Sequence, residues 1–364
     1  MNDQRRQSGL DLDLGDQCSA IAYGWAKRTF PTRLGRMGLP VLQVDGSFCN
    51  LMDFGELRVA MCSDGVGTKV EVAERTRRYD TLGHDLVAMV VDDLAANGVE
   101  PVNVSNILDV DVLDADIVDQ LMRGLHEAAR VAGVAVVGGE IAELGSRVRG
   151  WGDGMHFNWC ATAIGVLPRG INPIDGTRVA PGDLVVALRS RGFRSNGFSL
   201  ARRVLEADLG PDWHDRAWDG EVTWGQVMLT PSRIYSPGVQ ALIASGCALH
   251  GIAHVTGGGI PGNLERVLEP NGLGARLDRL FPPHDFMTDL IRRGGVEPRD
   301  AYRMFNMGTG MLLVVAADDA ERCVALLRER RYEAQVAGVV TPGSGITVIE
   351  PLGGREPCVF DGGR

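Results

Sequence analysis

The stretch "LRVAMCSDGVGTKV" (residues 57–70) joins an apolar run to a short loop that holds an acid, two glycines, a threonine and a lysine. The apolar part, residues 57–62, predicts a β-strand. Glycines after a strand expose backbone N–H groups that can bind phosphate, but they also suit a plain turn. The spacing is not that of a P-loop, in which the lysine precedes the hydroxyl residue. Both interpretations stay open for this loop taken alone.

The composition indicates an ordinary globular protein. The 364 residues are 45% hydrophobic and 23% charged, which suggests two domains or one large one. The net charge of −10 argues against a general nucleic-acid surface, although it permits a phosphate-bearing ligand. We find no apolar run that could cross a membrane and no secretory signal. Seven cysteines without CxxC or zinc-like spacing favour free thiols in a reducing cytoplasm.

Strands and helices are predicted throughout the chain, which indicates an α/β or α+β fold. A Pro/Gly-rich link at residues 168–182 is the preferred domain boundary, so we expect an N-terminal domain over 1–170, a C-terminal domain over 171–350 and a tail over 351–364. We expect helices near 18–30, 81–97 and 115–132, after the loop "RGFRSNGFS", from Pro231 with Thr230 as its cap, after "TGGG" and after "MLLVVAADD"; strands are expected at 57–62, 102–108, 134–140, 158–167 and 183–190.

Three acids are candidates for chemistry. In the helix at 81–97, Asp93 falls within the apolar arc, whereas Asp85 and Asp92 fall outside it, so Asp93 is the site candidate and Asp92 is expected to face solvent. A buried structural role for Asp93 is equally compatible with this pattern. Glu140 follows a predicted strand and two glycines, as Asp64 follows the first strand. Asp64, Asp93 and Glu140 could together hold the Mg²⁺ of a bound nucleotide.

Further loops in the second half combine glycines with polar side chains. "AHVTGGGIPGN" offers His254, a hydroxyl and three glycines at the start of a helix, which is a seat for an anion. A lone histidine beside a strand is more often packed for structural reasons. "FRSNGFS" and "FNMGTGM" are similar loops. Each of these signals is weak when taken singly.

Taken in order, the motifs resemble one family, that of aminoimidazole ribonucleotide synthetase, also called phosphoribosylformylglycinamidine cyclo-ligase. The resemblance extends from about Ser8 to about residue 350. It is carried by the runs "SDGVGTK", "HDLVAMVVDDLAANGVEP", "VVGGEIAE", "RSNGFSLARRVL", "TPSRIY", "HVTGGGIPGNLERVL" and "YRMFNMGTGM".

The resemblance implies a two-domain fold, a reaction and a partner. An N-terminal α/β domain would form a dimer-spanning sheet or barrel, and a C-terminal α+β domain would follow it. ATP, with Mg²⁺, would phosphorylate the formamide oxygen of formylglycinamidine ribonucleotide. Ring closure would then give aminoimidazole ribonucleotide, ADP and phosphate in purine biosynthesis. Two copies of the chain would form a homodimer, with no nucleic-acid or membrane partner.

The resemblance also implies roles for individual residues. Asp93, Lys69 and His254 would be catalytic, and Asp64, Asp93 and Glu140 would bind the metal. The ATP and its phosphates would contact Asp64, Gly65, Gly67, Thr68, Lys69, Gly139 and Glu140. The substrate would contact Arg194, Ser195, Asn196, Thr256, Gly257, Gly258 and Gly259.

Several positions depart from the family pattern. The family's G-G-F-G-G loop reads "GSFCN" at 46–50 and should be stiffer here, and its "DYYATGKL" reads "NILDVDVL" at 106–113. Arg194 replaces a histidine, Asp92 replaces an asparagine, and Ile141 replaces a threonine. A divergent cyclo-ligase is the preferred interpretation. The alternatives are a paralogue that activates a different amide or carbonyl oxygen, and a binding module without turnover.

Overall fold

The computed structural model describes residues 12–41, 47–168, 170–349, 351–354 and 356–361. The N-terminal half contains a six-stranded sheet in the order β1-β2-β3-β6-β4-β5, in which only the β4–β5 pair is parallel. Its strands are β1 (Leu39–Val41), β2 (Asn50–Asp53), β3 (Leu57–Gly65), β4 (Glu100–Val110), β5 (Ala135–Glu143) and β6 (Phe157–Pro168). Its helices are α2 (Leu12–Lys27), α3 (Val70–Thr76), α4 (Leu82–Ala96) and α5 (Ala115–Ala132).

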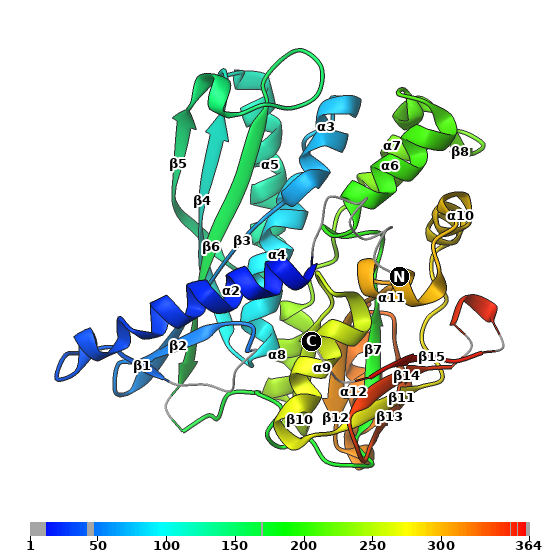
Figure 1. Ribbon diagram of the computed structural model, residues 1–364. Coiled ribbons are helices and arrows are strands. Elements are labelled where there is room, and N and C mark those ends of the chain that lie inside the picture. The colour runs from blue at the N-terminus through cyan, green and yellow to red at the C-terminus, as the bar shows by residue number, and fades with distance from the viewer. Residues whose placement is uncertain (1–11, 42–46, 169, 350, 355, 362–364) are drawn as a thin grey trace.

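The C-terminal half contains a seven-stranded sheet in the order β10-β12-β7-β13-β11-β14-β15 (Figure 1). Its strands are β7 (Leu184–Arg189), β10 (Leu249–His254), β11 (Gly274–Leu277), β12 (Thr309–Val315), β13 (Ala334–Thr341), β14 (Gly345–Val348) and β15 (Cys358–Phe360); β8 (Ala217–Asp219) and β9 (Val222–Thr223) form a separate pair. Its helices are α6 (Phe198–Leu209), α7 (Trp224–Met228), α8 (Ser236–Ala244), α9 (Gly259–Leu268), α10 (Asp285–Gly294), α11 (Pro298–Met304) and α12 (Ala320–Glu329).

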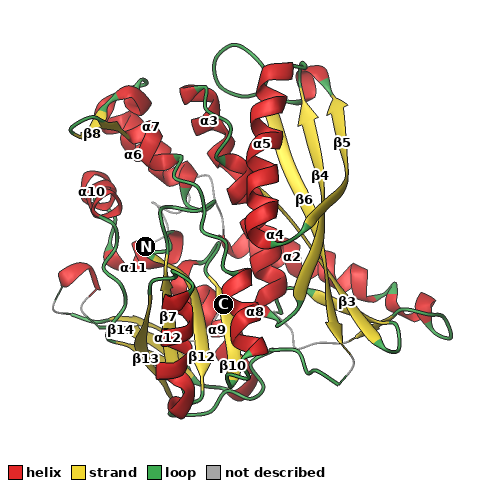
Figure 2. Ribbon diagram, turned by 180° about the vertical axis from the view of Figure 1, so that it is seen from behind, coloured by secondary structure: helices red, strands yellow, loops and turns green. Residues whose placement is uncertain are grey.

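Helix α4 lies between the two halves. It packs with α5 along one face of the N-terminal sheet, as Figure 2 shows, and it also contacts α8 and β10 of the other half. Nearly all of its residues are therefore buried, including Asp85 and Asp92, which are both fully buried. The expectation that Asp92 faces solvent is wrong, because the segment at the start of α8 covers the side of α4 that carries it.

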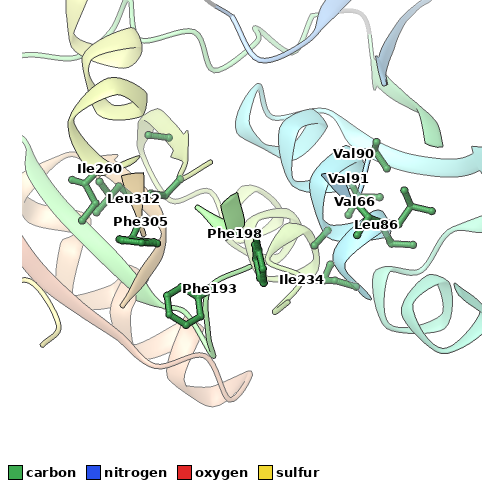
Figure 3. Close-up of a cluster of buried hydrophobic side chains, with 14 of the residues drawn as sticks. Val66, Leu86, Val90, Val91, Phe193, Phe198, Ile234, Ile260, Phe305 and Leu312 are labelled. Atoms are coloured by element: carbon green, nitrogen blue, oxygen red, sulfur yellow. The ribbon is translucent and has the colours of Figure 1, made fainter. Parts of the chain in front are cut away.

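The hydrophobic core is continuous across the two halves. One cluster of buried side chains includes Leu86 and Val90 of α4 together with Phe193, Phe198 and Phe305 of the C-terminal half (Figure 3). The two sheets thus share apolar packing as well as a chain connection. This shared core fixes the loops of one half against those of the other.

Most predicted elements are confirmed, and their bounds shift by a few residues. The helix expected from Pro231 is an exception, because α8 begins only at Ser236. Polar contacts hold the preceding residues in a non-helical path: the Thr230 carbonyl accepts from Lys69, and the backbone N–H of Ser232 donates to Asp85. Helix α2 begins at Leu12, earlier than expected.

Two further expectations concern residues that lie partly outside the described ranges. Of the segment 46–50, Gly46 lies outside them, and so does Ser8, where the resemblance begins. Cys49, within that segment, is buried, and its backbone N–H donates to the Asn97 side chain at 3.1 Å. In the part of the chain that the structure describes, no helix is both long enough and apolar enough to span a bilayer.

Candidate active site

Three loops from distant parts of the sequence meet beside α4. A methyl group placed on Gly67 would lie 3.9 Å from the Ser195 carbonyl oxygen, and one placed on Gly257 would lie 3.7 Å from Asn196 Oδ1. The Thr68 hydroxyl lies 3.4 Å from that of Ser199 at the start of α6. The glycine loops after β3, β7 and β10 are therefore neighbours, as their common chemistry suggested.

The loop after β10 is held rigidly. The Asn263 side chain donates to the carbonyl oxygens of Gly257 at 3.1 Å and Gly259 at 2.7 Å. Gly259 has φ +63°, and a methyl group on it would lie 2.0 Å from the Tyr302 carbonyl oxygen. Only glycine fits such a position, because L side chains rarely adopt this φ and there is no room for a Cβ.

Unsatisfied polar atoms line the place where these loops meet. Among the residues that the structure describes, Ser195 Oγ and Asn196 Nδ2 are buried and have no hydrogen-bond partner. Helix α6 begins at Phe198 and helix α9 at Gly259, so two helix N-termini start from the adjoining loops. Buried polar groups normally have partners, and helix N-termini attract anions. The arrangement suits a phosphate-bearing ligand.

Two carboxylates lie at one side of these loops. Asp64 ends β3 and keeps contact with solvent, yet the atoms packed around its carboxyl raise its pKa, and the negative charge of Asp93 raises it further. Asp93 accepts a hydrogen bond from Cys62 Sγ at 3.4 Å, and its other oxygen lies 2.7 Å from His254 Nδ1. Two carboxylates that repel each other can together form a cation-binding site.

A fully buried polar chain continues from Asp93 into the C-terminal half. His254 Nε2 lies 2.7 Å from an Arg194 terminal nitrogen, and the same nitrogen lies 3.1 Å from Asp92 Oδ2. Asp92 Oδ1 accepts the backbone N–H groups of Tyr235 and Ser236, each at 2.8 Å. Burial raises the pKa of Asp92, whereas His254 and Arg194 act to lower it. Arg194 thus faces the core, not the open loops.

Lys69 also lies away from solvent. Its ammonium is 2.7 Å from Asp85 Oδ2 and donates to the Thr230 carbonyl at 2.9 Å, and the side chains of both members of the ion pair are fully buried. Burial lowers the pKa of Lys69, and Asp85 opposes this shift. The structure therefore places the expected phosphate-binding lysine in a link between α4 and the segment before α8.

Glu140 does not join Asp64 and Asp93. Asp64 is in register with Ala161, Asn106 and Gly139, and this row of residues faces α4. Glu140 is in register with Ile107 in the next row, which faces the open side of the sheet. Glu140 and Asp64 are three strand spacings apart, about 14 Å. Within the described ranges, no group of three His, Cys, Asp or Glu side chains is arranged to hold a metal ion.

Residues that sequence analysis missed hold these loops in place. Asn263 fastens the loop after β10, and Asp85 binds both Lys69 and the Ser232 hydroxyl, at 2.7 Å and 2.5 Å. Both lie in runs that carried the family resemblance. Their partners, however, come from segments that only the fold brings near, so the sequence offered no specific signal for these roles.

Comparison with known proteins gives a consistent family assignment. Residues 46–167 match the family model "AIR synthase related protein, N-terminal domain", and residues 180–350 match the corresponding C-terminal domain. A phosphoribosylformylglycinamidine cyclo-ligase from Sorangium cellulosum is 40% identical over 92% of this chain and 94% of its own length. One from Thermococcus kodakarensis is 37% identical over 94% and 96%, respectively.

Solved structures share the fold at low sequence identity. The hydrogenase maturation protein HypE in complex with ATP superposes with a TM-score of 0.56 at 19% identity and covers 83% of this chain and 84% of its own. The T. maritima PurL complexed with FGAR gives 0.58 at 17% identity, over 85% of this chain and 46% of its own. These matches agree with the two-domain α/β architecture seen here.

Proposed function

Because the chain belongs to the phosphoribosylformylglycinamidine cyclo-ligase family, we propose that it uses ATP to close the imidazole ring of a phosphoribosyl substrate in purine biosynthesis. In this reaction the formamide oxygen of formylglycinamidine ribonucleotide takes the terminal phosphoryl group of ATP. The amidine nitrogen then attacks the same carbon, phosphate leaves, and aminoimidazole ribonucleotide and ADP are released. Phosphorylation makes a poor leaving group into a good one.

The observation that carries this proposal is the meeting of the three glycine loops around unsatisfied polar atoms. Within the described part of the chain, Ser195 Oγ and Asn196 Nδ2 are buried without hydrogen-bond partners, beside the starts of α6 and α9. A ligand with phosphate oxygens would satisfy both. HypE binds ATP on this fold and PurL binds FGAR on it, which supports a nucleotide and a ribonucleotide as ligand classes here.

We assign the following roles within this site. The N–H groups of Gly257 and Gly258 and of the first turn of α6, with Ser195, Asn196, Thr68 and Thr256, bind phosphate oxygens and align them with the acceptor. His254 orients the Asp93 carboxylate through its 2.7 Å contact. Gly65 and Gly67 let the loop after β3 approach the phosphates closely. The protein's contribution is mainly alignment and charge stabilisation.

The carboxylates fit a magnesium ion. Mg²⁺ is usually bound by one or two carboxylates together with substrate phosphates, and Asp64 and Asp93 supply two that lie near each other. When bound there, the ion would neutralise phosphate charge. Lys69 sits too deep for this role in the described structure, and we propose that it positions the neighbouring segments.

We also propose a homodimer that covers the open face of the N-terminal sheet. Met61 and Ile107 on this face are 57% and 51% exposed, beside the half-buried Ile164. An apolar sheet face of this kind is typical of a subunit interface. Gly139 and Glu140 lie at the edge of this sheet, so any contact they make with nucleotide would lie at the subunit boundary. Free cysteines support a cytoplasmic location.

The alternative, activation of a different carbonyl oxygen, depends on departures from the family pattern at positions such as Arg194. Arg194 is only 1% exposed and is bonded to Asp92, so its replacement of a histidine reflects core packing as well as the site. This weakens the argument for a different substrate. The proposal of a cyclo-ligase therefore stands ahead of the paralogue.

Asp93→Asn tests the function. We expect the variant to keep its fold but lose at least about 100-fold in turnover, because the asparagine keeps the volume and loses the charge. The measurement is the rate of both ADP and aminoimidazole ribonucleotide formation from Mg-ATP and formylglycinamidine ribonucleotide. Asp116→Asn, at the exposed start of α5, is the matched control and should keep the wild-type rate.

The outcomes separate the three hypotheses. Formation of both products by the wild type supports the cyclo-ligase. ADP release only with another amide acceptor would instead support a paralogue that activates a different oxygen. Failure to bind any nucleotide would support a binding module without turnover. A wild-type rate for Asp93→Asn would remove Asp93 from the site.

A further inference from the structure

Arg194 is the centre of the buried polar chain. One terminal nitrogen donates to the Arg233 carbonyl at 2.7 Å, and the other lies near both Asp92 and His254. Its guanidinium also stacks 5.0 Å from the Tyr235 ring. Its backbone has φ +61°, which residues other than glycine rarely adopt, so the surrounding contacts hold the residue in this conformation.

These contacts fix the proton position on His254. A guanidinium has donors only, so His254 Nε2 must accept the hydrogen bond from Arg194. The proton of the neutral imidazole is then on Nδ1 and is donated to Asp93 at 2.7 Å. A proton on Nε2 would face the guanidinium N–H and leave that contact repulsive.

The other charged group at Arg194 is Asp92. It lies 3.1 Å away and is itself fixed by the two backbone N–H groups at the start of α8. Further charges nearby are Asp64 from β3 and the Lys69–Asp85 pair. Arg194 and Asp92, which lie 102 positions apart in the sequence, are therefore in direct contact.

We propose that Arg194 and Asp92 act as one positioning unit, which keeps the His254 proton on Nδ1 and so aims the Asp93 carboxylate at the site. Each member needs the other, since either one alone leaves a buried charge without its partner. The unit's effect on turnover rests on the proposed function, but its effect on His254 does not.

The first test is the tautomer of His254 in the full-length protein without ligands. Long-range ¹H–¹⁵N spectra of ¹⁵N-histidine-labelled protein distinguish Nδ1–H from Nε2–H, and His254→Gln assigns the signal by its loss. We expect a single Nδ1–H species. An Nε2–H species, or an average of the two, would overturn the proposal whatever the enzyme's substrate proves to be.

The second test is a double-mutant cycle on turnover. We expect Arg194→His and Asp92→Asn each to lower kcat by about 100-fold, the effect of displacing a catalytic group by roughly 1 Å. The double variant, in which neither position leaves a buried charge without its partner, should recover to within about tenfold of wild type. Arg293→His, which breaks an ion pair with Asp208 elsewhere in the same half, is the matched control for general loss of an arginine.

The cycle stays informative if a single variant does not fold. A folded, active double variant beside an unfolded single variant shows the same coupling. A double variant whose losses multiply, or which fails to fold while both single variants fold, would show that the two residues act separately. If the tautomer is as expected but the wild type has no cyclo-ligase activity, the proposed function fails while the positioning of His254 stands.

Discussion

Lys69 and Asp85 form an ion pair from which solvent is excluded, so its two members depend on each other. Both side chains are fully buried, and the Nζ–Oδ2 distance is 2.7 Å. Removing one partner leaves an uncompensated charge in the core, which typically costs about 3–5 kcal/mol. We expect Lys69→Met to lower the free energy of unfolding by this amount in urea denaturation.

A surface pair provides the comparison. Arg276 and Asp278 lie 2.8 Å apart with the arginine side chain 52% exposed, so Arg276→Met should change the free energy of unfolding by less than about 1 kcal/mol. If Lys69→Met were as mild as this control, Lys69 would be free to act elsewhere, including at the phosphates.

Individual residues show which features of the site could be predicted from the sequence and which could not. The position of Asp64 at the end of a strand could be predicted, because the pattern of apolar residues and glycines is local. The burial of Asp92 could not, since it depends on α8 and β10 covering the far side of α4. The same holds for the pairing of Lys69 with Asp85, and for Glu140, whose separation from Asp64 depends on strand order.

At the scale of elements, the start of α9 depends on a glycine. Gly259 combines φ +63° with a methyl position 2.0 Å from the Tyr302 carbonyl oxygen. Gly259→Ala adds the cost of a left-handed backbone to a clash with α11, together about 2–4 kcal/mol. We expect it to lower the thermal midpoint and to weaken nucleotide binding measured by calorimetry.

Gly262 is the matched position within the same helix. A methyl group there meets nothing within 4 Å, so Gly262→Ala should be neutral or stabilise the protein by about 0.5–1 kcal/mol. Equal effects of the two substitutions would show that the loop before α9 tolerates rearrangement. Most of the predicted helices and strands lie near their expected positions, but α2 begins earlier than expected and contacts with α4 delay the start of α8 until Ser236.

At the scale of the whole molecule, the open face of the N-terminal sheet carries exposed apolar side chains, among them Met61 and Ile107. Ile107 lies at its centre in register with Cys160 and Glu140. Because a charge there would be costly to bury, we expect Ile107→Lys to convert a dimer into monomers in light scattering coupled to size-exclusion chromatography. The control variant Arg58→Lys, in β3 of the same sheet, should leave the molar mass unchanged. A monomeric wild type would contradict the proposed interface.

The two acids of α4 that fasten the segment leading into α8 have a consequence for how the polypeptide could be divided. Asp85 and Asp92 are supplied by the first half, yet the backbone groups that they satisfy belong to the second. A cut in the proline- and glycine-rich link would therefore give two fragments that each expose part of a shared interior. The link separates the halves along the chain, but because they share a core we expect them to unfold in one cooperative transition.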